Sequence, residues 1–313
     1  MRLIVTGSLS FDHVMSMPGR FKDYLMPEKL HIINVSFLMD TFRLDKGGTA
    51  GNQAYSLALL GLKPILLGSA GKDFFEYKRH LDKAGVNTSR IKMYRKQVTA
   101  TGFAMTDKNN NQVWGFYSGA MKEDAHLSLL DKAKENDFVV LAPTDPRAME
   151  KYVDECCQIK CRFLFDPAFQ TPRLKINKLK KGALKAKIVI GNDYEIALLL
   201  KRLKLAKRQL LKPGKILITT LGSKGSIIET KEARYKIPIA KPDNSSDPTG
   251  AGDAYRAGFL AGYLRGLSLP ESGRMGSLAA TYSVEKSGTQ THKFSLSSFK
   301  RRYKINFNHE LRY

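Results

Sequence analysis

The clearest chemical pattern in the chain is the run from Asp247 to Asp253, DPTGAGD, which the apolar stretch AYRAGFLAGYLRG follows. A glycine-rich turn that opens a helix offers free backbone N–H groups and the positive end of the helix dipole, so it can bind an anion. The N–H groups of Gly250, Ala251 and Gly252 could hold a phosphoryl group there. Asp253 could then act as a base toward a hydroxyl. The same residues also fit an ordinary helix start, in which Asp253 only complements the dipole.

Short apolar segments that end in turn residues alternate with helical stretches along most of the chain. The predicted strands are LIVTG, PILLGSAG, FVVLAP, RFLFDP, KIVIGND and KILITTLG. The predicted helices between them include GNQAYSLALLGL, DPRAMEKYVDECCQI and YEIALLLKRLKL. Alternation of this kind predicts parallel crossovers in an α/β fold, with ligands bound at the carboxyl ends of the strands.

Two regions, residues 13–46 and 95–118, depart from this alternation. The first contains the alternating segments HIINVSFLMD and TFRLDK, and the second places QVTATGFAMTD and QVWGFYSG on either side of an Asn-rich turn. The second pattern predicts a β-hairpin. We expect both regions to contribute strands to a small sheet inserted near the N-terminal half. Because the sequence contains no repeat or convincing linker, residues 1–313 are interpreted as one domain.

The composition excludes several classes of protein. The chain has 313 residues, of which 42% are hydrophobic, so it can bury a sizeable core and is not disordered throughout. Apolar runs stay well below the roughly 18 residues of a membrane span. The apolar start, MRLIVTGSLSFDHV, is interrupted at Asp12 and His13, which indicates a buried strand and a turn and not a signal peptide. The three cysteines, at 156, 157 and 161, are odd in number and clustered, which argues against a disulfide framework. They favour a reducing, cytoplasmic location.

The net charge of +23 allows two interpretations. Between Arg173 and Lys215 there are 14 Lys or Arg and only two acidic residues. Such a stretch attracts phosphates whatever their sequence, which suggests a nucleic acid or an anionic surface. However, IALLLKRLKLAKRQLL intersperses its charges with apolar residues, as an amphipathic helix with a solvated basic face does. Since no recognisable nucleic-acid module accompanies the charge, we do not expect nucleic acid as a partner.

Four motifs together resemble the ribokinase-like (PfkB) family of small-molecule kinases. DPTGAGDAYRAGFLAG is similar to the C-terminal signature of that family, and three other segments match its motifs in the same order: GGTAGN at 47–52, NDYE at 192–195 and TLGSKG at 220–225. The resemblance covers nearly the whole chain. It implies a three-layer fold with a central, mostly parallel sheet, and a small β-lid within residues 13–46 and 95–118.

The resemblance also implies ATP and Mg²⁺. The residues expected to bind ATP are Asn192, Thr220, Gly222, Gly225, Gly250 and Gly252, with Glu195 associated with the metal and Arg173 near the transferred phosphates. Potassium activation is common in the family, although the sequence identifies no ligand side chains for it. From the residues alone, Asn192 is equally a helix cap, and the Asn192–Glu195 pair could bind magnesium through water.

A narrower similarity concerns the substrate. VTGSLSFDHVMSMPGRF, LMPEKLH, SFLMD, FYSGAM and SGTQ are similar to bacterial adenosine kinases of the mycobacterial type. This implies that a carboxylate binds the ribose, helped by three polar or small residues, and that aromatic side chains of the hairpin enclose the purine. The implied substrate residues are Asp12 with Ser8, Gly48 and Asn52 for ribose, and Phe103, Phe116, Phe37, Met121 and Gln170 for the base. Phe169 departs from the family pattern.

The residues taken alone leave these roles open. A carboxylate can accept two hydrogen bonds from a vicinal diol, and aromatic rings stack on a flat base, but Asp12 could be a turn residue and both hairpin phenylalanines could be core. The family resemblance implies a kinase that converts adenosine to AMP, with a lid that excludes water, and a homodimer formed through the lid sheet. Another nucleoside (guanosine, inosine or cytidine), a sugar (ribose or fructose) and a nucleic-acid-binding protein on a kinase scaffold remain alternatives.

Other catalytic patterns are missing from the sequence. There is no GxxxxGK[ST] run, which excludes a P-loop kinase, and no GxGxxG follows the first predicted strand, which argues against a dinucleotide oxidoreductase. The cysteines have no neighbouring histidine or second cysteine pair with zinc-site spacing.

Overall fold

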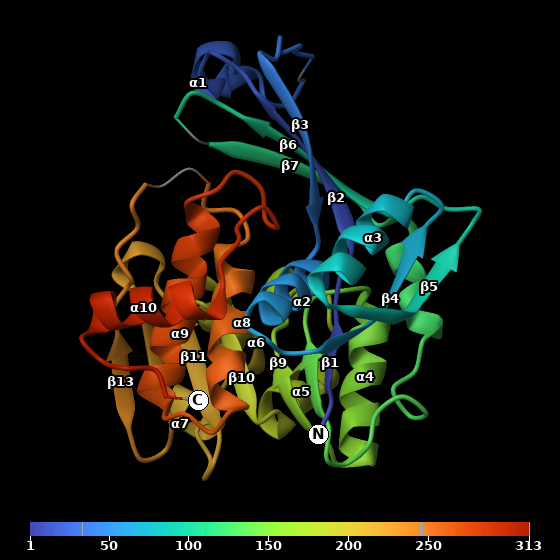
Figure 1. Cartoon of the computed structure of the whole chain (residues 1–313). Helices are drawn as coiled ribbons and strands as arrows, with labels where there is room; N and C mark the ends of the chain where they lie inside the picture. The colour runs from blue at the N-terminus through green and yellow to red at the C-terminus, as the bar shows by residue number, and fades with distance from the viewer. Residues whose placement is uncertain (33, 110, 245–246, 313) are drawn as a thin grey trace.

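Strands that are buried on both faces form the centre of the molecule. The computed structural model describes residues 1–32, 34–109, 111–244 and 247–312. Nine strands form one sheet in the order β13-β12-β11-β10-β9-β8-β1-β4-β5 (Figure 1). All neighbours are parallel except the pairs β11–β12 and β12–β13. The strands are β1 Leu3–Thr6, β4 Pro64–Gly71, β5 Asn87–Tyr94, β8 Phe138–Leu141, β9 Arg162–Phe165, β10 Ile188–Asn192, β11 Ile216–Thr220, β12 Ser226–Glu229 and β13 Arg234–Ile237.

Helices cover both faces of this sheet. Alternate residues of a strand enter different cores: Val5 packs with Leu57 and Phe259, whereas Ile4 packs with Tyr152 and other residues of the opposite face. The helices are α1 Phe21–Tyr24, α2 Thr49–Leu59, α3 Phe75–Ala84, α4 Pro146–Ile159, α5 Ile176–Lys185, α6 Asp193–Leu203, α7 Lys207–Leu210, α8 Ala251–Tyr263, α9 Leu269–Val284 and α10 Leu296–Phe307, with short 3₁₀ turns η1 Pro27–Lys29, η2 Gly119–His126, η3 Ala168–Gln170 and η4 Gly222–Lys224. The predicted α/β fold with a mostly parallel sheet is confirmed.

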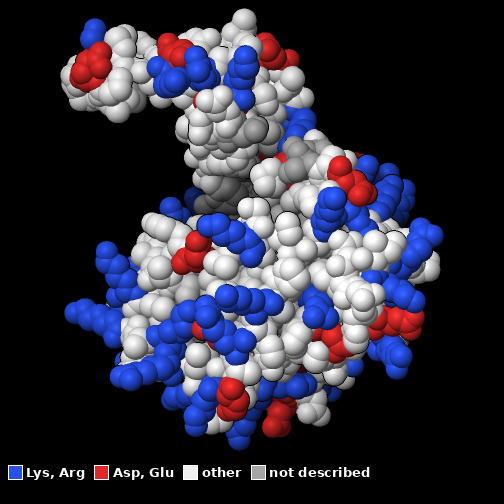
Figure 2. All heavy atoms as spheres, turned by 90° about the vertical axis from the view of Figure 1, so that its left-hand side faces the viewer, with Lys and Arg blue, Asp and Glu red and all other residues white. Residues whose placement is uncertain are grey.

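A second, four-stranded sheet, here called the lid, stands above the carboxyl end of β1 (Figure 1). Its order is β3-β2-β6-β7, with β2 Ser10–Ser16, β3 Thr41–Gly47, β6 Ala100–Thr106 and β7 Gln112–Tyr117. Strand β2 is antiparallel to β3 and parallel to β6, and β6 and β7 form the predicted hairpin. Figure 2 shows the far end of the lid projecting beyond the main domain. The predicted small sheet is therefore present.

The strands of the lid differ from the prediction in two places. SFDHV, which was interpreted as the turn after the first strand, instead forms most of β2. HIINVSFLMD forms no strand in its described residues, and its Ile32 and Leu38 side chains are exposed. Alternation alone does not make a strand, because a strand also needs a partner edge and a surface to cover.

The basic segment behaves as an amphipathic surface. IALLLKRLKLAKRQLL forms helices α6 and α7, which a left-handed residue, Lys204, separates. Ile196, Leu199 and Leu203 are buried along one side of α6. On the face drawn in Figure 2, Lys and Arg are distributed over the main domain with Asp and Glu among them. Within the described residues, no helix has the length and apolar character needed to cross a membrane.

Candidate active site

A cavity of ≈ 490 Å³ lies between the lid and the carboxyl ends of the main-sheet strands. It contains most of the residues that the sequence predicts for substrate and phosphate, although they come from distant parts of the chain. The predicted residues that line it are Ser8, Asp12, Gly48, Asn52, Phe116, Met121, Gln170, Arg173, Gly250 and Asp253. The fold therefore brings the glycine-rich turn, the lid carboxylate and an aromatic ring to one space.

Asp253 lies in the first turn of α8 and borders the cavity. The amide groups of Asn52 and Gln53 donate hydrogen bonds to its two oxygens, at 2.9 and 3.3 Å. The surrounding protein desolvates the carboxylate and raises its pKa, while Arg256 and the two amides oppose that rise. The side chain thus has the environment of a base whose affinity for a proton is higher than that of a free carboxylate.

The glycine turn has the geometry that an anion site requires, with one difference from the prediction. Gly250 has φ +80°, a left-handed conformation that favours glycine, and a Cβ there would lie 2.9 Å from Thr289. The N–H of Ala251 donates to the carbonyl of Pro248 at 3.2 Å, so it is engaged within the turn. Since Gly252 is the second residue of α8, its N–H is too early to find an intrahelical acceptor.

A buried guanidinium beneath this turn is a feature that we did not predict. Arg256, one turn into α8, has its Nε 2.5 Å from Oδ2 of Asp166 and donates from Nη2 to Oδ1 at 3.0 Å. Its Nη2 also lies 3.9 Å from Oε2 of Glu195. Burial raises the pKa of Asp166 to about 6, although Arg256 opposes the rise. A charged residue inside the apolar run AYRAGFLAG was the signal available in the sequence.

Asp12 lies on β2 and faces the cavity from the lid. Burial raises its pKa to about 6, a hydrogen bond of 3.1 Å from Ser10 opposes this, and the charges of Asp45 and Asp253 add to it. A Cβ on Gly47 would come within 2.0 Å of its Oδ2, and one on Gly102 within 2.8 Å of its Oδ1. The carboxylate therefore occupies space that these two glycines leave open.

The loop after α9 fixes the orientation of Asn52. Thr289 Oγ1 and Gln290 Nε2 donate to Asn52 Oδ1, at 2.7 and 2.9 Å, so the amide nitrogen must face Asp253. Both donors belong to the SGTQ segment, which the sequence singled out, although neither residue was predicted as part of the site. Thr289 and Gln290 therefore influence Asp253 through Asn52.

Arg43 connects the lid to the glycine turn, and it too was not predicted. From β3, its Nε donates to Asp45 and its Nη2 donates to Asp247, both at 2.5 Å. Asp247 also accepts hydrogen bonds from the N–H groups of Thr249 and Gly288. In TFRLDK, the two-residue spacing of Arg43 and Asp45 places them on one face of the strand.

The two predicted ATP motifs meet at the end of the main sheet. Asn192 and Thr220 are direct neighbours at the ends of β10 and β11. Asn192 also caps α6, because its side chain accepts from the N–H of Glu195 and Glu195 accepts from the N–H of Asn192, both at 2.8 Å. Gly222 and Gly225 have φ +58° and +84° in the turn after β11. None of these ATP-motif residues lines the cavity.

Phe103 and Phe37 are not brought to the cavity. Phe103 is paired with Gly115, and its neighbour Gly102 is paired with Phe116. Because successive residues of a strand point to opposite faces, Phe103 and Phe116 lie on opposite faces of the lid. The Phe103 ring instead stacks on His13 at 4.9 Å. Phe37 packs against Phe21 and Tyr24. Phe103 and Phe37 therefore do not line this cavity, whereas Trp114 and Phe169 do.

The described residues fit a magnesium ion only as a companion of phosphate. Over these residues, no group of three or more His, Cys, Asp or Glu could hold a metal by itself. Mg²⁺ usually keeps several waters and binds one or two carboxylates together with substrate phosphates. The Glu195 carboxylate, in the first turn of α6 directly after β10, suits that role.

The chain is similar in sequence and in fold to known kinases. The chain is 32% identical to a protein named nucleoside kinase from Methanothermobacter thermautotrophicus over 295 residues, covering 93% of this chain and 91% of that one. It is 33% identical to a nucleoside kinase from Methanocaldococcus jannaschii over 279 residues, covering 86% and 89%. The fold matches the Burkholderia thailandensis nucleoside kinase in complex with inosine with a TM-score of 0.90 and 29% identity, covering 98% and 99%.

The family comparison covers most of the chain, including all four motifs. Residues 10–294 match the pfkB family of carbohydrate kinases. The match confirms the resemblance predicted from the glycine turn, GGTAGN, NDYE and TLGSKG. The chain therefore belongs to the pfkB family of carbohydrate kinases, which are phosphotransferases.

Proposed function

We propose that this protein is an ATP-dependent nucleoside kinase that transfers the γ-phosphoryl group of ATP to the 5′-hydroxyl of adenosine. The observation that carries the proposal is the set of residues that line the cavity beneath the lid. It combines Asp253 and the glycine turn, which suit phosphoryl transfer, with Asp12, which suits a vicinal diol, and half-exposed aromatic rings, which suit a flat base. Relatives named nucleoside kinase support the same substrate class.

In the proposed reaction, Asp253 accepts the proton of the 5′-hydroxyl as its oxygen attacks the γ-phosphorus. The bond between that phosphorus and the bridging oxygen breaks, ADP leaves, and the proton remains on Asp253. The Gly252 N–H, the start of α8 and Arg173 stabilise the negative charge of the transferred group. Mg²⁺ held by the ATP phosphates and Glu195 would supply further neutralisation of phosphate charge.

Gln170 supports a base that carries an N–H donor. Its Nε2 donates to the carbonyl of Thr144 at 2.7 Å, which fixes Oε1 as the free acceptor. Oε1 is buried without a hydrogen-bond partner in the described residues, and Gln170 lies in the cavity wall. The amino group of adenine and the N1–H of hypoxanthine are both suitable donors. Inosine is therefore the second candidate, favoured by the inosine complex of the similar Burkholderia kinase.

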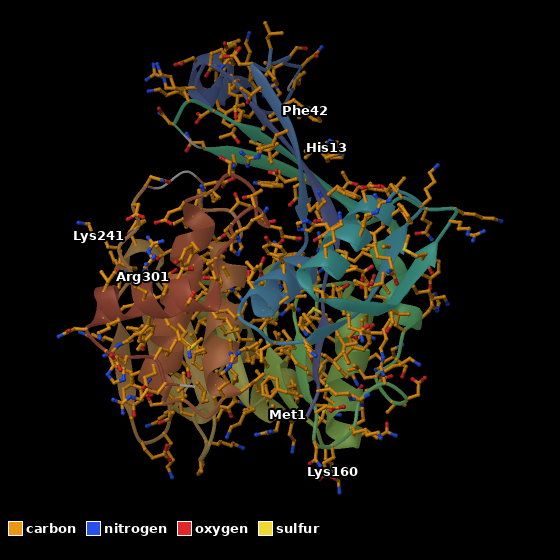
Figure 3. The ribbon with its side chains drawn as sticks, viewed as in Figure 1. Met1, His13, Phe42, Lys160, Lys241 and Arg301 are labelled. Atoms are coloured by element: carbon orange, nitrogen blue, oxygen red, sulfur yellow. The ribbon has the colours of Figure 1, made fainter. Side chains whose placement is uncertain are left out.

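The protein is also proposed to form a homodimer through the outer face of the lid, the face opposite the cavity. Strand pairing places five exposed apolar side chains there: Phe42, Leu44, Phe103, Val113 and Tyr117. Figure 3 labels Phe42 and His13, whose rings are 5.6 Å apart on neighbouring strands. Five exposed apolar side chains on one face indicate an interaction surface, and in the proposed dimer the same face of a second copy would cover it.

The substrate is tested by measuring turnover with MgATP and a panel of adenosine, inosine, guanosine, cytidine, ribose and fructose. We expect the highest kcat/KM with adenosine and AMP as its product. A higher value with inosine would keep the nucleoside kinase and change only the base. A preference for ribose or fructose would contradict the proposal, although the fold and the role of Asp253 would stand.

Asp253→Asn is expected to lower kcat by about 10²–10⁴-fold, the usual contribution of a positioned base. The affinity for ATP should change little, because the glycine turn and the strand-end motifs remain. Asp131→Asn removes a carboxylate that is exposed and remote from the cavity, and should leave kcat unchanged. Near-normal turnover of the Asp253 variant would remove this residue from the role of base.

Nucleoside affinity should depend on pH through Asp12. Its pKa of about 6 means that the carboxylate becomes protonated as the pH falls through this value, and a protonated carboxyl loses acceptor capacity for the diol. The dissociation constant should therefore be flat above pH 6 and rise below it by up to about tenfold per pH unit. Calorimetry on the Asp253→Asn protein isolates this titration from that of the base. A flat profile would exclude Asp12 from diol binding.

The homodimer is tested by sedimentation. The wild-type chain of 35.1 kDa should sediment with twice that mass, and Phe42→Ser should shift it toward the single chain. Phe75→Ser is the matched control, since Phe75 has the same exposed fraction, 63%, but lies on α3 of the main domain. A wild-type protein that sediments as a single chain would refute the dimer without affecting the proposed reaction.

A further inference from the structure

The aromatic side chains that face the cavity are not the set that the sequence predicts. Trp114 and Phe116 come from strand β7 of the lid, and Phe169 comes from the η3 turn of the main domain. Each of these three residues is between 43% and 50% exposed. Large rings left half-exposed in a cavity indicate a surface that a flat apolar group covers.

Trp114 is held in one orientation next to the lid carboxylate. Its Nε1 donates to Gln112 Oε1 at 3.1 Å, which restrains the indole. A Cβ on Gly102 would lie 3.0 Å from Cζ3 of Trp114 and 2.8 Å from Oδ1 of Asp12. One glycine therefore separates the indole from the carboxylate. A ligand whose diol binds Asp12 has an aromatic surface directly beside it.

The Trp114 ring is also available for a ligand. Among the aromatic side chains of the described segments, none stacks on it, whereas Phe103 is engaged with His13 on the opposite face of the lid. An indole is the largest aromatic surface that a protein can offer to a base, and stacking does not depend on the hydrogen-bonding edge of that base.

Phe169 faces Phe116 from the main domain, so the aromatic surface bridges the lid and the body of the protein. The two ring centres are 6.4 Å apart. The turn that carries Phe169 is well anchored: Ala168 has φ +37°, a strained conformation for a residue with a Cβ, and Gln170 is buried and bonded to Thr144. The position of Phe169 is therefore fixed by its neighbours.

We infer that Trp114 and Phe169 are the specificity-determining residues of this kinase for a nucleoside over a free sugar. Trp114 stacks on the base beside the ribose bound to Asp12, and Phe169, with Phe116, closes the subsite from the main domain. The inference rests on the proposed nucleoside kinase activity and assigns its base subsite to residues other than Phe103. It also gives the departure at Phe169 from the family pattern a function.

The chain contains one tryptophan, so its fluorescence reports on this subsite directly. Titration of the wild-type protein with adenosine in the absence of ATP should change the emission in a saturable way. Titration with ribose to the same concentration should not. Calorimetry measures independently when adenosine saturates the protein. If the emission is unchanged at that saturation, the assignment of Trp114 is wrong.

Kinetics give the second test. Trp114→Ala should raise the KM for adenosine by about 5- to 150-fold, the range that loss of base–aromatic stacking produces, and Trp114→Phe should restore most of it. Phe169→Ala should raise the same KM, while in all three variants the KM for ATP stays constant. Phe75→Ala, an exposed aromatic on α3, should change either KM by less than about twofold.

The outcomes separate this inference from the proposed function. A wild-type enzyme that phosphorylates nucleosides while Trp114→Ala retains its KM for adenosine refutes the inference alone. If Phe103→Ala raises the KM for adenosine more than Trp114→Ala does, the inference is wrong and Phe103 contacts the base, as the sequence predicts. A wild-type enzyme that prefers a free sugar refutes the proposed function itself. Unchanged circular dichroism and urea midpoints identify the variants that are folded.

Discussion

The site depends on a guanidinium that has almost no contact with water. Arg256 is 7% exposed, and such a charge is tolerated only when carboxylates and hydrogen bonds replace the water that it loses. Asp166 supplies this pairing, and Glu195 and Asp253 lie within its field. Breaking a buried pair of this kind costs about 3–5 kcal/mol, because the remaining charge is left uncompensated. The positions of α8, of the end of β9 and of the start of α6 are therefore linked through one side chain.

That arrangement resolves a conflict in the proposed chemistry. A base must be shielded from water to act in a closed site, but shielding raises the pKa of a carboxylate and reduces the ionised fraction. The charge of Arg256 limits the rise in the pKa of Asp253. Hydrogen bonds from the amides of Asn52 and Gln53, on α2, limit it further. The same cation lies beneath the turn where phosphate would bind, so one charge serves both the base and the anion site.

The lid is linked to the main domain by a more exposed ion pair. Its polar link to the main domain at the glycine turn is the Arg43–Asp247 ion pair, in which the arginine side chain is 38% exposed. Asp247 is only 9% exposed, so solvent reaches this pair mainly from the arginine side. In the opening that the proposed reaction requires, this partly exposed link would break more readily than the buried Arg256–Asp166 pair.

The sequence predicts those parts of the site that are encoded locally. DPTGAGD, GGTAGN and NDYE identify the turn, the amide that faces the base and the helix cap, because each motif sets its own backbone geometry. Arg256 and Arg43 could not be assigned in this way, since their partners lie 90 and 204 positions away in the chain. Phe103 shows a second limit: in a strand, a shift of one residue exchanges the two faces, and only the register reveals which phenylalanine faces the cavity.

In the proposed enzyme, the residues for phosphoryl transfer and those for substrate selectivity belong to different parts of the fold. The selectivity for a substrate could therefore change while the reaction stays the same. Asp253, Arg256 and the glycine turn belong to the main domain, where they are tied to the core through α8. Asp12 and Trp114 belong to the lid, and Phe169 to a surface turn, where side chains can be exchanged at little cost to the core. Gly102 is the exception, because any larger residue would displace both Asp12 and Trp114. In the proposed nucleoside kinase, this glycine would couple recognition of the sugar by Asp12 to recognition of the base by Trp114.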